Sequence, residues 1–379
     1  MLKVATIGMG KAGGEVAELA KKAYSIDGVA INTSIDDMTT VTNIHQISVG
    51  DDKGAGKDRN IAKQFVYQKA KEMLALPELK ELIENHEVIF NISSTDGGSG
   101  SGMAPVLTDV LKRLYPEKRF ILVGILPTLK ESVAGQQNTI EYMKEIRNFD
   151  STYMLYDNNT RANLTRSEMF QDVNREIVLD MAIIRGDFQY ATPYTNIDER
   201  DMFKIIETPG RLVIAKVFGF KEKDIDDKSV EDRLIESLRS STHAELDRDQ
   251  IIKRLGIITN LSEKVYKTFD TNVSKFKELV GEPLEGFEHI YINKTEEETN
   301  RVIAIMSGLS VPDDRIEKIL QRIDEVTAQL TKTKESSVLD NANTDLIDML
   351  RGTGTSATTK DENNDLSDLD SIFGQYIKK

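Results

Sequence analysis

Six short apolar segments alternate with helix-like stretches in the first half of the chain, and this alternation constrains the fold most strongly. The segments are KVATIG, GVAINT, QISVG, EVIFNIS, RFILVGIL and STYMLY. Between them, apolar spacing predicts helices near residues 12–24, 59–85, 103–114 and 135–147. Strands that alternate with helices form parallel sheets. The carboxyl ends of such strands share one edge, where open α/β sheets bind their ligands.

The second half of the chain predicts a smaller α/β unit after a long helix at 167–186. Its strand-like segments are GRLVIAKVFGF, IIKRLGIIT, FEHIYIN and RVIAIMSG, and the last two close a second small sheet. Apolar residues at helical spacing predict one helix over 261–280 and an amphipathic helix after Pro312. From about Ser336 the pattern fades into a polar segment that predicts disorder, and the chain ends in LDSIFGQYIKK.

Composition excludes several classes of protein. The net charge of 49 − 63 = −14 argues against a broad surface for direct nucleic-acid binding. The absence of cysteine excludes disulfides and cysteine–zinc sites, and the four histidines lack metal-ligand spacing. No apolar run approaches the roughly 20 residues of a membrane span, and the chain starts directly with a strand-like segment. We therefore expect a cytoplasmic protein that does not bind membranes.

Three glycine-rich loops follow predicted strands, and they indicate phosphate binding. GMGKAGG at 8–14 contains G-x-G-x-x-G, GAGKDRN occupies 54–60, and DGGSGSG occupies 96–102. Glycine leaves backbone N–H groups free to approach a phosphate. A dinucleotide needs one such loop, and Asn32 and Thr33 stand where the ribose of NAD would require an acid. Three loops at one edge favour a nucleoside triphosphate.

Other familiar chemistries fit less well. Asp58 follows GAGK, so no Walker A pattern forms, and neither Ser99 nor Ser101 satisfies G-x-S-x-G. The alternative from another class is an NAD-dependent oxidoreductase that uses the first loop. That alternative leaves GGSGSG and the acidic segment NIDERD, at 196–201, without a role.

Together these motifs resemble those of the tubulin/FtsZ superfamily of GTPases. DGGSGSG resembles the signature G-G-G-T-G-[ST]-G, with Asp96 at the first glycine and Ser99 at the threonine. GMGKAGG resembles the first phosphate loop, GAGKDRN the loop that senses the γ-phosphate, and NIDERD the catalytic N-x-D-x-x-D loop. All four occur in the family's order within residues 1–310. The long helix after Pro312 and the tail with terminal lysines most resemble the TubZ group of plasmid and phage partition proteins.

The resemblance implies an N-terminal Rossmann-like parallel sheet with helices on both faces, a long central helix, a smaller C-terminal α/β domain, an extended C-terminal helix and a flexible tail. The implied boundaries are a GTP-binding domain at 1–165, the central helix at 166–186, a catalytic loop and short helix at 187–206, a GTPase-activating domain at 207–311, the long C-terminal helix at 312–336, and a partner-binding tail at 337–379.

The resemblance also implies which residues bind GTP or GDP, with Mg²⁺ held mainly through phosphates and water. Phosphate contacts fall on Gly10, Lys11, Ala12, Gly13, Gly97, Gly98, Ser99, Gly100, Ser101 and Gly102, and the γ-phosphate loop on Gly54, Ala55 and Gly56, where Lys57 or Asp52 responds to hydrolysis. Asn32 and Thr33 form the loop after the second strand, Glu131 stands at a ribose-binding position, and Asn158 and Asn174 read guanine. An amide has both a donor and an acceptor, which suits the guanine edge.

The catalytic residues implied are Asn196, Asp198 and Asp201. By itself, Asp198 reads as the N-cap of a short helix. Carboxylates would repel phosphate, so they fit a role in polarising the attacking water. A helix at 167–186, about 28 Å long, separates them from the glycine loops of the same chain.

That separation predicts a head-to-tail filament in which each acidic loop reaches the neighbouring subunit's nucleotide. The implied function is a filament-forming GTPase that partitions plasmid or phage DNA through a DNA-bound adaptor protein at the tail. Cell-division FtsZ and a virion-positioning phage tubulin are the alternatives within the superfamily.

Overall fold

The computed structural model describes residues 1–225, 227–247, 250–270, 273–293 and 300–335. The predicted partner-binding tail at 337–379 lies outside the described residues. Within them, no helix is both long enough and apolar enough to cross a membrane.

The first six strands form the parallel sheet that the sequence predicts. They are β1 (Val4–Met9), β2 (Asp27–Asn32), β3 (His45–Ser48), β4 (Val88–Ser94), β5 (Arg119–Leu126) and β6 (Thr152–Asp157). Their spatial order is β3-β2-β1-β4-β5-β6, and all neighbours pair in parallel. The order reverses between β1 and β4, so the carboxyl ends of these two strands flank the switch point where α/β sheets bind ligands.

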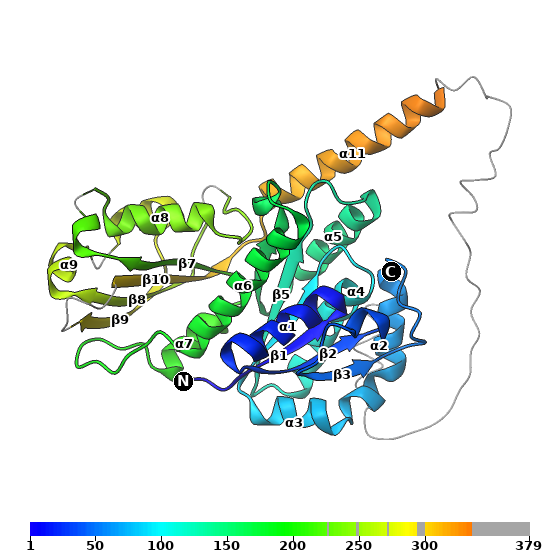
Figure 1. Ribbon diagram of the computed structural model, residues 1–379, viewed down its shortest axis with the longest axis horizontal. Coiled ribbons are helices and arrows are strands. Elements are labelled where there is room, and N and C mark those ends of the chain that lie inside the picture. The colour runs from blue at the N-terminus through cyan, green and yellow to red at the C-terminus, as the bar shows by residue number, and fades with distance from the viewer. Residues whose placement is uncertain (226, 248–249, 271–272, 294–299, 336–379) are drawn as a thin grey trace.

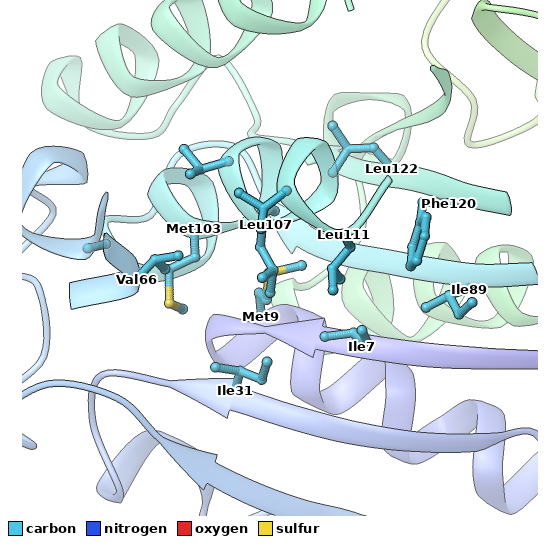
Figure 2. Close-up of a cluster of buried hydrophobic side chains, with 14 of the residues drawn as sticks. Ile7, Met9, Ile31, Val66, Ile89, Met103, Leu107, Leu111, Phe120 and Leu122 are labelled. Atoms are coloured by element: carbon cyan, nitrogen blue, oxygen red, sulfur yellow. The ribbon is translucent and has the colours of Figure 1, made fainter. Parts of the chain in front are cut away.

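Helices cover both faces of this sheet because successive strand residues point to opposite sides (Figure 1). One face packs on α2 (Arg59–Leu74), α3 (Pro77–Asn85), α4 (Ser99–Leu114) and α5 (Val133–Ile146). Figure 2 shows Met103 and Leu107 of α4 packed towards Ile7 and Met9 of β1. The other face packs on α1 (Gly10–Tyr24) and α6 (Arg166–Arg185). The predicted Rossmann-like layers are confirmed.

The second half of the chain extends the same sheet. Strands β7 (Gly210–Phe220), β8 (Arg254–Ser262), β9 (Glu285–Asn293) and β10 (Asn300–Leu309) continue the order as β7-β10-β8-β9. β6 joins β7 in parallel through only two residue pairs, Thr152 with Gly210 and Tyr153 with Arg211. The prediction of a separate second sheet is therefore wrong, because this short pairing makes one sheet of ten strands.

Several helices differ from their predicted bounds for local reasons. The stretch at 59–85 divides into α2 and α3 because Pro77 occupies the first turn of α3, where its missing N–H is harmless. Helix α4 begins at Ser99, inside the glycine loop. The stretch at 261–280 holds the end of β8 and two short helices, α9 (Glu263–Thr268) and α10 (Ser274–Val280). In the second half, α8 (Val230–Ser240) packs on the sheet.

Two long helices organise the molecule around the sheet. Helix α6 lies between the two halves in Figure 1, and a capping box between Thr165 and Glu168 fixes its start. Helix α11 (Asp313–Glu335) extends away from the body. Its first turn is anchored by Arg315, which donates from Nε to Asp157 at 2.6 Å and from Nη2 to the Pro127 carbonyl at 2.6 Å.

Candidate nucleotide site and acidic loop

A cavity of about 520 Å³ opens at the carboxyl ends of β1, β2, β4, β5 and β6. Eleven residues predicted to bind the nucleotide line it: Gly10, Lys11, Ala12, Asn32, Gly97, Gly98, Ser99, Gly100, Glu131, Asn158 and Asn174. Seven others predicted for the same role lie outside the lining: Gly13, Thr33, Gly54, Ala55, Gly56, Ser101 and Gly102. The binding roles of all eighteen stay predictions.

The two glycine loops at the switch point touch each other through glycine backbone. Gly10 has a φ of 70°, and a Cβ at this position would lie 2.9 Å from the Gly100 nitrogen. A Cβ on Gly100 would lie 2.4 Å from the Met9 carbonyl oxygen. Side chains would separate the loops, so only glycine permits this contact.

Helix α4 begins beside the cavity and directs its N-terminus at it. Gly98 is the N-cap, and Ser99 and Gly100 are the first two helical residues; all three line the cavity. The first backbone N–H groups of a helix have no partner within the helix, and the helix dipole adds partial positive charge there. Such an end binds anions without further help.

Gly13, Ser101 and Gly102 serve packing instead of lining the cavity. A Cβ on Gly13 would lie 2.1 Å from the Ile92 carbonyl oxygen, so this glycine lets α1 approach β4. A Cβ on Gly102 would lie 2.5 Å from the Arg59 carbonyl oxygen, where α4 crosses α2. The Ser101 hydroxyl accepts a hydrogen bond from Arg59 Nε at 3.2 Å.

The loop at 54–58 lies against the glycine loop at 96–102. A Cβ on Gly98 would lie 2.8 Å from Lys57 Cα and 3.0 Å from Ala55 Cβ. The Gly54 nitrogen donates to the Thr33 carbonyl at 2.9 Å, and the Thr33 hydroxyl is 2.6 Å from that of Ser99. The predicted γ-phosphate loop thus borders the cavity wall, with Thr33 between the two loops.

Asp52, Gly54, Gly56 and Lys57 all have positive φ values. The Lys57 ammonium donates to the Ser132 hydroxyl at 3.0 Å on α5. Backbone in this region is unfavourable for residues other than glycine, so surrounding contacts hold the loop in shape.

The other end of the cavity carries amides and an aromatic side chain. Asn158 and Asn174 both line it, as predicted. Asn158 Oδ1 and Asn32 Nδ2 are buried and have no partner among the described residues. Buried polar atoms are normally paired, so these two atoms are candidates for contact with a ligand.

Sequence reasoning missed several residues that line this cavity. Arg166 and Phe170 come from α6 at spacings of four residues before Asn174, and this periodicity could have revealed them. Arg166 also lies 3.8 Å from the Glu131 carboxylate. Glu15, Asp37 and Asp96 are the other charged residues of the lining that were not among the predicted binding residues.

Asp96 places a carboxyl group in the wall of the cavity. Burial raises the pKa of Asp96, and the charge of Glu131 adds to the rise, while Lys57 and a hydrogen bond from Ser94 oppose it. With Glu15 and Asp37 also in the lining, the cavity carries more acidic than basic groups. A hard cation would therefore reduce the repulsion between these carboxylates and a bound polyphosphate.

The acidic loop lies away from the cavity, beyond the carboxyl end of α6. Asp198 is the N-cap of α7 (Glu199–Ile206), and its Oδ1 accepts from the Asp201 nitrogen at 2.9 Å. Asn196 accepts a hydrogen bond from His289 Nδ1 at 2.8 Å. The predicted N-cap is confirmed.

Buried Ile197 fixes the acidic loop, while Asn196 and Asp198 remain exposed to solvent. Arg166 lines the cavity at the first residue of α6, and α6 runs for 20 residues, or about 30 Å, before it reaches this loop. One chain therefore does not bring the two predicted parts of its active site together.

Glu176 and Asp180 of α6 also approach His243. Together they are the one group with metal-ligand spacing that the described residues contain. The Lys216 ammonium already bonds to Glu176 at 2.8 Å and to Asp180 at 2.6 Å. Burial by itself would raise the pKa of Asp180, but Lys216 lowers it below its ordinary value. The arrangement is a buried ion-pair network that joins α6 to β7.

A cavity of this size at the switch point of a parallel sheet, walled by glycine backbone and a helix N-terminus, is typical of nucleotide-binding α/β proteins. Residues 3–165 match the family described as "Tubulin/FtsZ family, GTPase domain". This part of the chain is therefore similar to the GTPase domain of that family.

Relatives resemble more of the chain. The tubulin-like protein TubZ of Clostridium botulinum C phage is 24% identical over 353 residues, covering 89% of this chain and 88% of the relative. The tubulin-like protein CetZ2 of Haloferax volcanii is 27% identical over 224 residues, covering 55% of this chain and 61% of the relative.

Solved structures show the same fold. TubZ of Clostridium botulinum phage c-st matches with a TM-score of 0.68 and 21% identity, over 86% of this chain and 98% of the other. A GTPγS-form protofilament of TubZ from Bacillus thuringiensis serovar israelensis matches with a TM-score of 0.71 and 17% identity, over 88% and 94%. A GTPγS-bound protofilament of CetZ2 from Haloferax volcanii matches with a TM-score of 0.67 and 20% identity, over 86% and 100%.

Proposed function

We propose that the protein is a GTPase that assembles head to tail, so that each subunit boundary completes one hydrolysis site. The observation that carries the proposal is the distance between the cavity and the acidic loop, which lie at opposite ends of α6. A contact between opposite ends of identical subunits does not close, and it therefore builds a filament. The solved protofilaments of TubZ and CetZ2 support self-association.

GTP is the substrate that fits the cavity best. The unpartnered Asn158 Oδ1 is an acceptor, and guanine offers two adjacent donors on one edge, N1–H and N2–H₂, whereas adenine has an acceptor at N1 and a donor only at N6. Asn174 adds a second amide, and Phe170 adds an aromatic surface in the same wall. The N-terminus of α4 and the loop around Gly10 suit the phosphates.

Mg²⁺ fits the same site through its acidic lining. We propose that it is held mainly through phosphates and water, as its reluctance to lose water favours. Asp96 supplies a carboxyl group in the wall of the phosphate end. Burial raises the pKa of Asp96, and a cation beside it would lower that pKa. The ion would neutralise charge on the phosphates during hydrolysis.

Hydrolysis would then depend on the neighbouring subunit. Asp198 and Asp201 orient each other through their capping hydrogen bonds at the exposed end of α7. Docked on the cavity of another subunit, these carboxylates would polarise a water for attack on the γ-phosphate. Assembly thus activates hydrolysis, and the loss of the γ-phosphate weakens the filament.

The cellular role that we propose is partition of plasmid or phage DNA in the cytoplasm. TubZ, whose likeness covers most of both chains, supports this choice over cell division or virion positioning. A net charge of −14 disfavours direct binding of DNA, so a DNA-bound adaptor would connect the filament to its cargo. We propose residues 337–379 as the site of that contact.

A pelleting assay tests the proposed activity. The protein should sediment with GTP and Mg²⁺, sediment for longer with a slowly hydrolysed GTP analogue, and stay in solution with ATP or GDP. Phosphate release should follow sedimentation. Sedimentation that ignores the nucleotide would contradict the proposal, and binding of NADH in place of GTP would favour an oxidoreductase.

A further inference from the structure

Asn138 stands behind the phosphate end of the cavity, on the second turn of α5, and it was not among the predicted site residues. Its side-chain amide nitrogen lies within hydrogen-bond distance of three backbone carbonyl oxygens: 2.9 Å from that of Lys57, 3.1 Å from that of Gly97 and 3.2 Å from that of Asp96. Because all three neighbours are acceptors, the NH₂ group of the Asn138 side chain, and not its oxygen, must face them. One side chain thus binds both the loop at 54–58 and the loop at 96–98.

Helix α5 is held firmly against these loops, so the position of Asn138 is fixed. Ser132 caps the helix by accepting from the Gly135 nitrogen at 3.3 Å. The next residue, Thr139, places its hydroxyl 3.0 Å from that of Thr95. A Cβ on Gly135 would lie 3.3 Å from Asp96 Cβ, so glycine lets the helix approach closely.

The direction of these carbonyl groups decides where the neighbouring N–H groups point. In a trans peptide the C=O and the following N–H point in opposite directions. The carbonyls of Asp96 and Gly97 accept from Asn138, and that of Gly97 also accepts from the Ser101 hydroxyl, so the N–H groups of Gly97 and Gly98 point to the other side. Gly97 and Gly98 line the cavity, where such N–H groups would be placed to meet an anionic ligand.

We propose that Asn138 is a positioning residue that turns the N–H groups of Gly97 and Gly98 towards the phosphates and ties the loop at 54–58 to them. It does not touch the nucleotide, and it acts through the carbonyl groups that it binds. The inference rests on the proposed function, because it takes a guanine nucleotide as the ligand. Its consequence is specific: loss of the amide weakens binding of phosphates and leaves binding of the nucleoside unchanged.

The test compares ligands that differ only in their phosphates. The dissociation constants of a slowly hydrolysed GTP analogue, GDP and guanosine are measured for wild type and for Asn138→Leu, which keeps the size of the side chain but removes its donor. The matched control is Gln137→Leu, which removes an exposed amide from the neighbouring position of α5. Asn138→Ser, which adds no apolar surface, serves in place of the leucine variant if circular dichroism shows that the latter is unfolded.

We expect Asn138→Leu to weaken binding of the GTP analogue and GDP by about 10- to 100-fold, the effect of losing a hydrogen bond to a charged group. Guanosine binding and the Gln137→Leu control should stay at wild-type values. A merely structural role would reduce the folded fraction and act equally on all three ligands. Unchanged GDP binding, or an equal loss for guanosine, would overturn the inference about Asn138 and leave the proposed function standing. Failure of the wild type to bind any guanine nucleotide would overturn the proposed function as well.

Discussion

Gly98→Ala separates the two phosphate loops by a known amount. The φ of Gly98 is −87°, which alanine adopts without strain, so the effect of the substitution is steric. The new Cβ would lie 2.8 Å from Lys57 Cα and 2.9 Å from the Lys57 nitrogen. Normal contact between such atoms requires about 3.5 Å, so the loop at 54–58 must retreat by about 0.7 Å.

The affinity for GTP should report this displacement. The free protein can relieve the overlap by shifting the loop, but a ligand that needs the loop in place must restore it. Overpacking of this kind costs about 1–3 kcal/mol, which corresponds to a loss of about 5- to 150-fold in affinity. GDP lacks the γ-phosphate that the loop is proposed to meet, so its affinity should change much less.

Titration of wild type and Gly98→Ala with a slowly hydrolysed GTP analogue and with GDP measures the difference. Gly286→Ala in β9 is the control, because its added Cβ meets no atom within 4 Å. If Gly98→Ala loses GDP and the GTP analogue equally, or loses neither, the assignment of the loop at 54–58 to the γ-phosphate is wrong.

Two further predictions concern selectivity and stability. Asn158→Leu should weaken GTP binding about 5-fold while leaving the weak binding of ATP unchanged, and Asn158→Asp, which keeps an acceptor, should retain the preference in a competition titration. Burial would raise the pKa of Glu18, but hydrogen bonds from Lys22 and Asn43 lower it to about 2. The lowered pKa contributes stability that is present above pH 4.5 and is lost as the pH falls towards 2. Between pH 4.5 and pH 2, the free energy of unfolding measured with urea should therefore fall by about 3 kcal/mol more in the wild type than in Glu18→Gln. An equal fall in both proteins would contradict the prediction.

The N-terminal sheet could be predicted from the sequence because most of its strands are short apolar runs bounded by polar or glycine-rich residues. The join between the halves could not. It depends on the pairing of Thr152 and Tyr153 with Gly210 and Arg211, residues almost 60 positions away that show no pairing signal. Arg211 is buried there and donates to the carbonyls of Ala244 and Glu245, a contact that only the tertiary structure creates.

The candidate site was predictable where its residues follow strands and less so where helices supply them. Asn32 ends β2 and the glycine loops follow β1 and β4, and the edge of the sheet brings them together. The sequence does not distinguish glycines that face a ligand from those that allow close packing. Gly98 lines the cavity, whereas Gly102 of the same motif supports the crossing of α4 and α2. Asn138 was missed because its partners are backbone carbonyls, which leave no mark in a sequence.

The claim that one subunit completes the active site of the next is tested most directly by mixing two inactive variants. Asp201→Asn keeps an intact cavity and retains an oxygen for the Asp198 N–H, but it lacks the second carboxylate. Ala12→Trp fills the cavity, as loss of GTP binding in a titration would verify, and keeps the acidic loop. Glu199→Gln, in the same turn of α7, controls for the change in charge.

Phosphate release from GTP is measured for each variant alone and for their mixture at increasing concentration. Each variant alone should be inactive, and the mixture should hydrolyse GTP at a rate that rises with protein concentration, because a subunit with an intact acidic loop docks on one with an intact cavity. A mixture as inactive as its components, together with concentration-independent hydrolysis by dilute wild type, would show that the site is complete within one chain and contradict the account.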